Sequence, residues 1–219
     1  MSPKIHQIKA RPAKAPSPGR KAEEAAPRAR GPIRDAIGLL ELTSIAKGVE
    51  ATDIMLKAAD VELLTSRAIC SGKYMVLVRG DVAACSSALS AGQDLGGEAV
   101  ADAIVIPHLH EQVFPALSQS AEVEAVQALG VLEAFNVATL IEGADAAVKA
   151  AQVRLIEIRI AMALGGKAFC ILTGEVAAVR AAVDAGKEVI GEKGLLTNWA
   201  VIPAPRPELV KEILGGRLL

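Results

Sequence analysis

The apolar and polar pattern from residue 36 onward predicts a strand followed by a helix. Residues 36–42 form an apolar run of strand length. Ser44, a favoured N-cap residue, follows this run. After it, apolar side chains recur at helical spacing, namely Ile45, Val49, Thr52, Leu56 and Ala59. We expect a helix that turns this stripe toward a sheet.

Three more strands and a second long helix complete the unit. The predicted strands are residues 61–69, 74–79 and 100–106. Gly72 lies in the turn between the first two of them, and Gly80-Asp81 starts the helix, where Asp81 suits the positive end of the helix dipole. A short helical segment is expected around residues 111–117. The predicted fold is therefore α+β, an antiparallel sheet with helices on one side.

The whole pattern occurs twice. The sequence that starts at Ala36 recurs from Ala128 at a constant offset of 92 residues. Identical residues meet at Gly38, Glu41, Ala46, Asp53, Lys57, Val61, Leu63 and Arg67. After two register slips of two residues each, positions 105–107 (Val-Ile-Pro) match 201–203, and a second short helix is expected around 208–214. The chain is an internal duplication, and we predict one domain over residues 35–119 and another over residues 126–215.

Residues 1–34 differ in composition from the rest. They carry nine Lys or Arg against Glu23 and Glu24, although the formal net charge of the chain is −1. Rich in Pro and Ala and without apolar periodicity, this segment is predicted to be a disordered basic tail, because it cannot bury enough surface to offset its ordering entropy. It serves either to solubilise the chain or to tether it to cargo or to another component.

Composition excludes several classes of protein. Aromatic residues make up 2% of the chain, which leaves few platforms for stacking nucleic-acid bases. No apolar run is long enough to span a membrane, and no secretory signal is apparent. Three cysteines without a close pair argue against a disulfide framework. There is no P-loop, no nucleophile elbow and no Ser/His/Asp constellation, so we expect no catalytic residues.

The motifs of both copies resemble the bacterial microcompartment shell domain. In the first copy they are AIGLLEL, DIMLKAADVELL, CSGKY, VRGDVAAC and VIP, and in the second ALGVLEA, DAAVKAAQVRLI, GGKAF, LTGEVAAV and VIP. The resemblance covers everything except the tail, about 85% of the chain. It implies two ferredoxin-like shell domains in tandem, which assemble as a trimer that mimics a hexamer and tile into the shell of a compartment in the bacterial cytoplasm.

Within that family the chain is most similar to the iron–sulfur shell proteins of propanediol-utilisation microcompartments. That resemblance implies that Cys70 is a metal ligand in the turn that lines the central pore. Three copies of Cys70 would hold one [4Fe–4S] cluster per trimer, for electron transfer or cluster exchange across the shell. Ser71 stands where that subtype tends to have proline, which could loosen the turn. There are two alternatives: Cys70 is a pore thiol that binds no metal, or it binds another metal.

The resemblance also assigns two groups of residues by position. The pore-lining residues are Ile69, Cys70, Ser71 and Gly72 in the first copy and Met162, Ala163, Leu164 and Gly165 in the second. The residues at tile edges are Lys57, Lys149 and Arg79. Packing is the expected role of Met162, although its thioether is a soft ligand, and a solvated helix face is the alternative for the two lysines.

Other candidates carry weaker signals. Cys85 lies on the buried face of a predicted helix, and Cys170 lies in the middle of a predicted strand. We expect both to pack in the core as small apolar residues. His108 and His110 have a spacing that suits zinc, but no second ligand pair accompanies them. Glu41 and Glu133 repeat because the chain is duplicated, which is no sign of an acid–base pair.

We expect a homotrimer that contacts other microcompartment shell proteins and an encapsulated redox enzyme, and neither nucleic acid nor a membrane. Two other classes stay open. One is a plain gated pore for small metabolites without a cluster. The other is a ligand-sensing trimer of ferredoxin-like domains.

Overall fold

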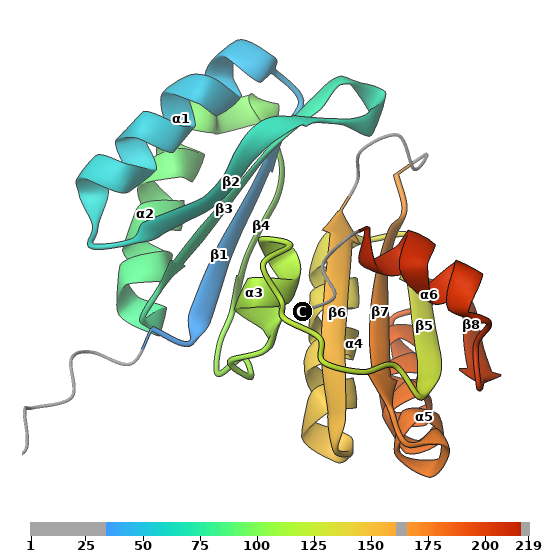
Figure 1. Ribbon diagram of the computed structural model, residues 1–219. Helices are drawn as coiled ribbons and strands as arrows, with labels where there is room; N and C mark the ends of the chain where they lie inside the picture. Colours follow the sequence, from blue (N-terminus) through green and yellow to red (C-terminus); the bar gives the residue numbers. More distant parts are fainter. Residues whose placement is uncertain (1–33, 161–165, 216–219) are drawn as a thin grey trace, which may run out of the picture. The chain divides into compact units, whose positions relative to one another are not determined.

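The computed structural model describes residues 34–160 and 166–215, which contain two four-stranded antiparallel sheets (Figure 1). The described residues belong to one compact unit, which contains both copies of the repeat. The predicted tail falls almost entirely outside the described residues. No helix within the described ranges is long and apolar enough to cross a membrane.

The first copy follows the predicted order of elements. Its elements are β1 (Ala36–Leu42), α1 (Ile45–Ala58), β2 (Glu62–Ile69), β3 (Lys73–Gly80), α2 (Val82–Gly96), β4 (Val100–Ile106) and α3 (Val113–Leu117). The strands are arranged in the order β2-β3-β1-β4, and Leu39 of β1 lies opposite both Leu77 and Ile104. The α+β prediction is confirmed, with strand bounds that differ by one residue at most.

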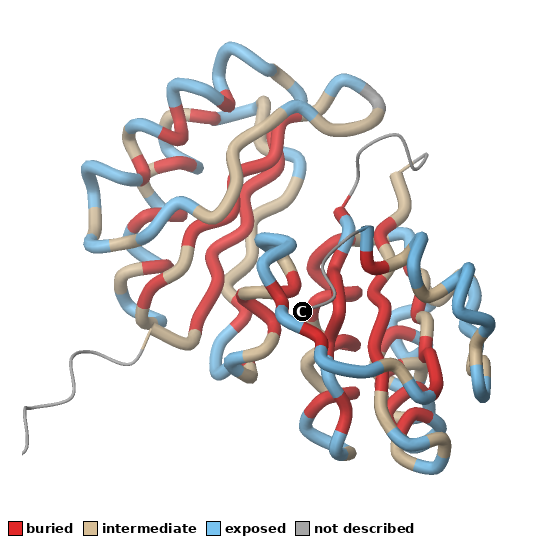
Figure 2. The backbone as a smooth tube through the Cα atoms, in the orientation of Figure 1, coloured by how far each residue is buried: buried red, intermediate tan, exposed pale blue. Residues whose placement is uncertain are grey.

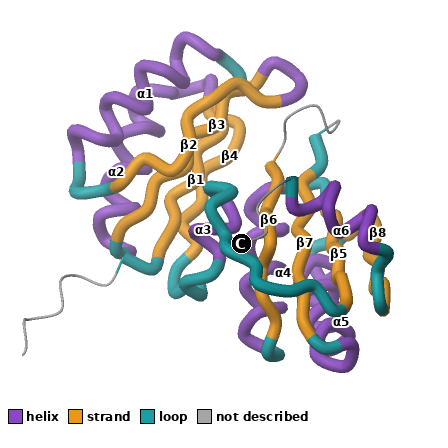
Figure 3. The backbone as a smooth tube through the Cα atoms, viewed as in Figure 1, coloured by secondary structure: helices purple, strands orange, loops and turns teal. Residues whose placement is uncertain are grey.

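The second copy repeats this topology (Figure 3). Its elements are β5 (Ala128–Ala134), α4 (Val137–Ala150), β6 (Val153–Ile160), β7 (Ala168–Gly174), α5 (Val176–Glu192), β8 (Leu196–Pro203) and α6 (Pro207–Leu214). The strand order β6-β7-β5-β8 matches that of the first sheet. The duplication seen in the sequence is therefore a duplication of fold.

Polar side chains begin three of the four long helices. Ser44 accepts a hydrogen bond from the Lys47 amide at 3.3 Å, and Asn136 does the same for Thr139 at 2.9 Å. Asp81 accepts from the amide of Ala84 at 2.7 Å, so α2 begins directly after it. Each cap satisfies an amide that the first helical turn leaves without an intrahelical partner.

The predicted stripe on the first helix is wrong in the first copy except at Thr52. Gly48, Ala51, Thr52 and Met55 form the buried face of α1, whereas Ile45 and Val49 are 50% and 55% exposed. Small residues pack against the sheet there because α1 lies close to it. A Cβ on Gly48 would come within 2.3 Å of the Tyr74 ring.

The same stripe is buried in the second copy. Val137 and Ile141 on α4 are 2% and 0% exposed, at the positions that correspond to Ile45 and Val49. The strands after the two helices differ in the same way, since β6 is mostly buried and β2 is not (Figure 2). The buried residues of α4 and β6 share one apolar cluster with residues of β1, β3, β4 and α3, so the first copy covers this face of the second.

The short helices do not lie on the side of the long ones. Val76 and Val78 cluster with buried residues of α1 and α2, whereas Met75 and Leu77 point to the opposite face and cluster with Phe114 of α3. The expectation that all helices cover one side is thus wrong for α3. The long helices α1 and α2 cover the face of the sheet that carries Val76 and Val78. Helix α3 lies on the other face, because it belongs to the connection that leads into the second copy.

Candidate functional site

The turn between β2 and β3 carries Cys70. Cys70–Gly72 form a single turn of 3₁₀ helix, and Gly72 has a φ of 73°, a conformation that favours glycine. The predicted pore-lining residues Ile69, Cys70, Ser71 and Gly72 thus lie together at the end of β2 and in this turn. Cys70 is partly exposed, unlike the other two cysteines. Its position in a pore stays a prediction.

An ion pair ties this turn to the neighbouring strand. Lys73 Nζ lies 3.2 Å from Glu41 Oε2 on β1, and the Glu41 side chain is largely buried. The second copy has the same pair, with Lys167 Nζ 2.7 Å from Glu133 Oε1. Both glutamates are therefore partners of lysines beside the turns, a structural role that needs no acid–base chemistry.

Cys70 shares a small cleft with the start of the second copy. The cleft measures about 170 Å³, and its walls include Ile69, Lys73, Phe135 and Val137 as well as Cys70. Phe135 is 56% exposed, which is unusual for a residue of its size. Phe135 was not among the predicted site residues. The sequence nevertheless distinguishes it, because the chain is poor in aromatic residues and the first copy has Thr43 at the corresponding position.

The matching turn of the second copy lies outside the described residues. Met162, Ala163, Leu164 and Gly165 all belong to the segment 161–165. Gly166, which follows it, has a φ of 87° and corresponds to Gly72. The roles given to these four residues stay predictions.

Cys85 and Cys170 are core residues, as expected. Each is fully buried, and the Cys85 thiol donates to the carbonyl of Ala36 at 3.6 Å. Burial raises the pKa of the Cys85 thiol to about 11 and that of Cys170 to about 12. Because a metal binds the thiolate, this environment disfavours both residues as ligands.

The two predicted edge lysines have different surroundings. Lys57 and Lys149 each pair with an aspartate one turn earlier, Asp53 and Asp145, at 2.5 Å. Lys149 Nζ also donates to the carbonyl oxygen of His108 at 2.7 Å, within the same chain. The acceptor belongs to the first copy of the repeat, whereas the resemblance implied a contact with a neighbouring tile. The tile-edge role of Lys149 and of the exposed Lys57 stays a prediction.

Arg79 makes its contacts within the first copy. Its Nε donates to the carbonyl of Arg34 at 2.9 Å, and its guanidinium carbon lies 3.8 Å from the centre of the Phe114 ring. Arg34 itself pairs with Asp60. These contacts hold the chain just before β1, and the edge role of Arg79 also stays a prediction.

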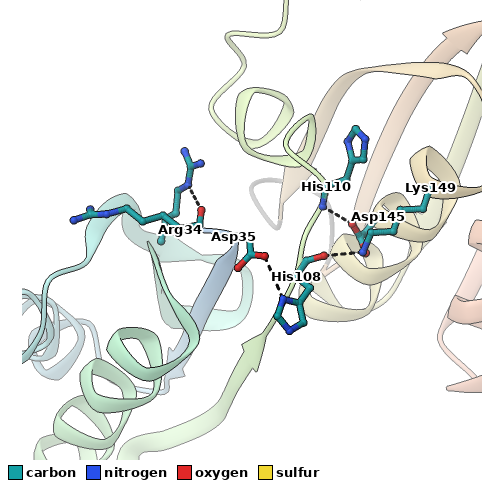
Figure 4. Close-up of polar contacts among 7 residues, drawn as sticks. Arg34, Asp35, His108, His110, Asp145 and Lys149 are labelled. Carbon is teal, nitrogen blue, oxygen red and sulfur yellow. Dashed lines mark hydrogen bonds and ion pairs between the residues drawn. The ribbon is translucent and has the colours of Figure 1, made fainter. Parts of the chain in front are cut away.

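The two histidines lie on the segment that joins the two copies (Figure 4). His108 Nδ1 lies 3.2 Å from the Asp35 carboxylate, and the backbone amide of His110 donates to Asp145 Oδ1 at 2.7 Å. Their rings point in different directions in Figure 4. Among the described residues, no group of three or more His, Cys, Asp or Glu side chains is placed to hold a metal ion.

Two repeated α+β domains with this strand order define the class of the protein. The chain belongs to the BMC domain family, whose model matches residues 36–109 and 128–205. It is a tandem-domain shell protein of bacterial microcompartments, a structural protein and not an enzyme.

Particular relatives support this membership. The bacterial microcompartment shell protein PduT of Citrobacter freundii is 44% identical over 84% of this chain and 100% of its own length. The carboxysome shell protein CsoS1A of Hydrogenovibrio crunogenus is 37% identical over 38% of this chain and 90% of its own length. A crystal structure of a microcompartment protein from Desulfitobacterium hafniense superposes with a TM-score of 0.79 at 46% identity, covering 80% of this chain and 98% of that one.

Proposed function

We propose that the chain forms a trimeric shell tile whose central pore holds one [4Fe–4S] cluster, bound by Cys70 from each of three chains. Its task is electron transfer or cluster exchange across the shell. Its partners are further copies of itself, other shell proteins and a redox enzyme inside the compartment. The trimer, the cluster and these tasks go beyond what family membership establishes.

The observation that supports a cluster best is the contrast among the three thiols. Cys70 is partly exposed in a tight turn, whereas Cys85 and Cys170 are buried and hold their protons strongly. Iron–sulfur clusters are bound by thiolates. Cys70 therefore fits the donor chemistry, and the other two do not.

The number of thiols supports a threefold arrangement. One Cys70 per chain supplies a single ligand, so a cluster needs several chains. A duplicated chain needs only threefold symmetry to present six similar domains, and closed cyclic symmetry is usual for homo-oligomers. Three thiolates leave one of the four irons without a cysteine ligand. When bound, such a cluster supplies one-electron transfer.

The residues around Cys70 support the turn. The Lys73–Glu41 pair fixes the strand that follows Cys70, and Gly72 allows the left-handed bend that ends the turn. Phe135 and Val137 line the cleft beside Cys70 together with the charged residues Glu41 and Lys73. Charges and hydrogen bonds around a bound cluster affect its redox potential.

A plain pore tile is the second candidate. It is favoured by Ser71, which stands in place of the proline typical of the iron–sulfur subtype, and by the charged Lys73–Glu41 and Lys167–Glu133 pairs beside the two turns. In that case Cys70 lines the pore and binds no iron.

Iron and acid-labile sulfide, measured after anaerobic purification, separate the two candidates. We expect about four irons per three chains for the wild type, and a trimer near 68 kDa, three times the 22.6 kDa of one chain. Cys70→Ala should lose the iron and the broad visible absorbance while the trimer stays folded. Cys85→Ala is the matched control and should keep both. Equal iron in the wild type and Cys70→Ala would leave the plain pore as the better account.

A further inference from the structure

Arg67 and Arg159 occupy the same position in the two copies but have different partners. Arg159 pairs at 2.9 Å with Glu157, whose side chain is buried. In the first copy Thr65 stands where the second copy has Glu157, so the matching carboxylate is missing. The strand pairing is irregular at the same place in both copies, just before Thr65 in β2 and just before Glu157 in β6. The backbone around the two arginines is therefore alike, and the difference lies in the side chains.

Arg67 carries a charge that no acidic side chain in residues 34–160 and 166–215 neutralises through an ion pair. One terminal nitrogen of its guanidinium donates to the carbonyl oxygen of Ile160 at 3.2 Å. Its Nε is buried and has no hydrogen-bond partner in the part of the chain that the structure describes. A guanidinium cannot remove its charge by losing a proton, and a buried N–H without an acceptor is costly. An anion would satisfy both needs.

A cleft of about 260 Å³ opens beside Arg67. Strands β2 and β3 and the end of α3 form one part of its wall, and β6 of the second copy forms the other. Most of the lining is aliphatic, and Arg67 is its only charged residue among those described. The aliphatic residues are Leu64, Leu77, Leu117, Ile158 and Ile160, and the uncharged polar ones are Thr65, Ser118 and Gln119.

The residues after α3 differ from their counterparts after α6 in a way that leaves this space open. Ser118 stands where the second copy has Leu214, which is fully buried. The next residues, Gln119 and Gly215, both adopt a left-handed conformation, with φ of 57° and 53°, so the two segments bend alike. This conformation is uncommon for residues other than glycine. The first copy thus has smaller side chains at Thr65 and Ser118, and a glutamine amide at the cleft in place of glycine.

The lining defines the chemistry of a ligand. A guanidinium pairs best with a planar carboxylate, which accepts two parallel N–H bonds. The Thr65 hydroxyl and the Gln119 amide can donate to the same oxygens. A phosphate dianion would meet one cation and a mostly apolar wall, so it fits this lining less well. The volume lies below the range of about 300–1,000 Å³ that is usual for drug-sized ligands, so the ligand has few atoms.

We propose that this cleft binds a short-chain aliphatic monocarboxylate. Its carboxylate pairs with Arg67, as the Glu157 side chain pairs with Arg159, and its hydrocarbon chain lies against the aliphatic wall. The site goes beyond the proposed function and depends on neither the trimer nor the cluster.

The test uses butyrate as the probe and the full-length chain, with binding followed by saturation-transfer NMR. For so small a ligand we expect a dissociation constant on the order of 1 mM. Butyramide has nearly the same shape without the charge, and it should bind at least about tenfold more weakly because the charged pair with Arg67 is lost. Inorganic phosphate should also bind more weakly than butyrate.

Three variants assign the site. Arg67→Gln should weaken butyrate binding at least about tenfold. Arg159→Gln is the matched control and should leave the affinity unchanged, because that guanidinium already has Glu157 as its partner. Thr65→Glu supplies the first copy with the carboxylate of the second, so it should abolish butyrate binding although Arg67 is still present.

Several results would overturn the site. Equal affinity of the wild type and Arg67→Gln for butyrate would do so, as would a wild type that binds phosphate but not butyrate. If the wild type shows no saturable binding, the charge of Arg67 is neutralised by other means and the proposal is wrong. Circular dichroism shows whether each variant is folded, and the comparison of butyrate with butyramide needs no substitution. Cys70→Ala should bind butyrate as the wild type does, so failure of this site and failure of the proposed cluster are observed separately.

Discussion

A Cβ atom on Gly186 of α5 would lie 2.8 Å from the carbonyl oxygen of Gly143 on α4 and 2.4 Å from the Leu132 side chain. The two glycines let the long helices of the second copy approach backbone to backbone over the sheet. Gly191 lies five residues later on the same helix, and a Cβ added there would meet no atom within 4 Å.

We expect Gly186→Ala to destabilise the protein by about 1–3 kcal/mol, because the added methyl overpacks a site bordered by backbone. Gly191→Ala should be neutral or stabilise the protein by up to about 1 kcal/mol, since alanine is the better helix former. Urea unfolding of both variants measures the difference. A similar loss of stability in both would mean that helix spacing is not the cause.

The buried thiols predict a loss of stability at high pH. Burial raises the pKa of Cys85 to about 11 and that of Cys170 to about 12, from an ordinary value of 9.0. Between these values the folded state binds more protons than the unfolded state, so the free energy of unfolding falls as the pH rises. The slope is up to about 1.4 kcal/mol per pH unit for each thiol.

Urea unfolding between pH 8 and pH 11 tests this prediction. Cys85→Ala should make the decline with pH shallower, apart from a constant loss caused by the smaller side chain. Cys70→Ala serves as the control for removing a thiol that is not buried. The prediction fails if Cys85→Ala has the slope of the wild type.

The tail gives a proteolytic prediction that rests on composition alone. Limited trypsin digestion should cut first at Arg20, Lys21, Arg28 and Arg30, because segments that cannot bury apolar surface are preferred sites of cleavage. Mass spectrometry of early fragments identifies the sites. Cleavage there at the rate of sites in the two domains would indicate a docked tail.

Much of the fold could be predicted from the sequence because the chain contains two copies of the same pattern. The short apolar runs and the turn glycines of each copy fixed the strands, and the caps Ser44 and Asp81 marked the helix starts to within one residue. Agreement between the copies removed the ambiguity that short apolar runs usually leave.

The buried face of α1 could not be found in the same way. Ile45 and Val49 have helical spacing and are apolar, yet the core of the first copy is closed by Gly48, Ala51 and Met55. Periodicity shows that a face is apolar, but not whether its own sheet or another domain covers it. The two copies share one pattern and differ in burial, which only the structure reveals.

The candidate site was predictable in part for the same reason. The turn with Cys70 and the helix positions of Lys57 and Lys149 are local features, and the structure contains them where expected. The bond from Lys149 to the His108 carbonyl and the cleft between Cys70 and Phe135 join distant parts of the chain. Such partners depend on how the copies pack, which local spacing does not encode.

The covalent link between the copies also has a genetic consequence. Since His108 and Lys149 meet within one polypeptide, each first copy is bound to a second copy before any other chain arrives. In the proposed trimer, two separate genes for the same domains would produce rings of mixed order and composition. Fusion instead makes the alternation of first and second copies heritable, so that a mutation in one copy would reach every second position of the proposed ring and leave the positions between them untouched.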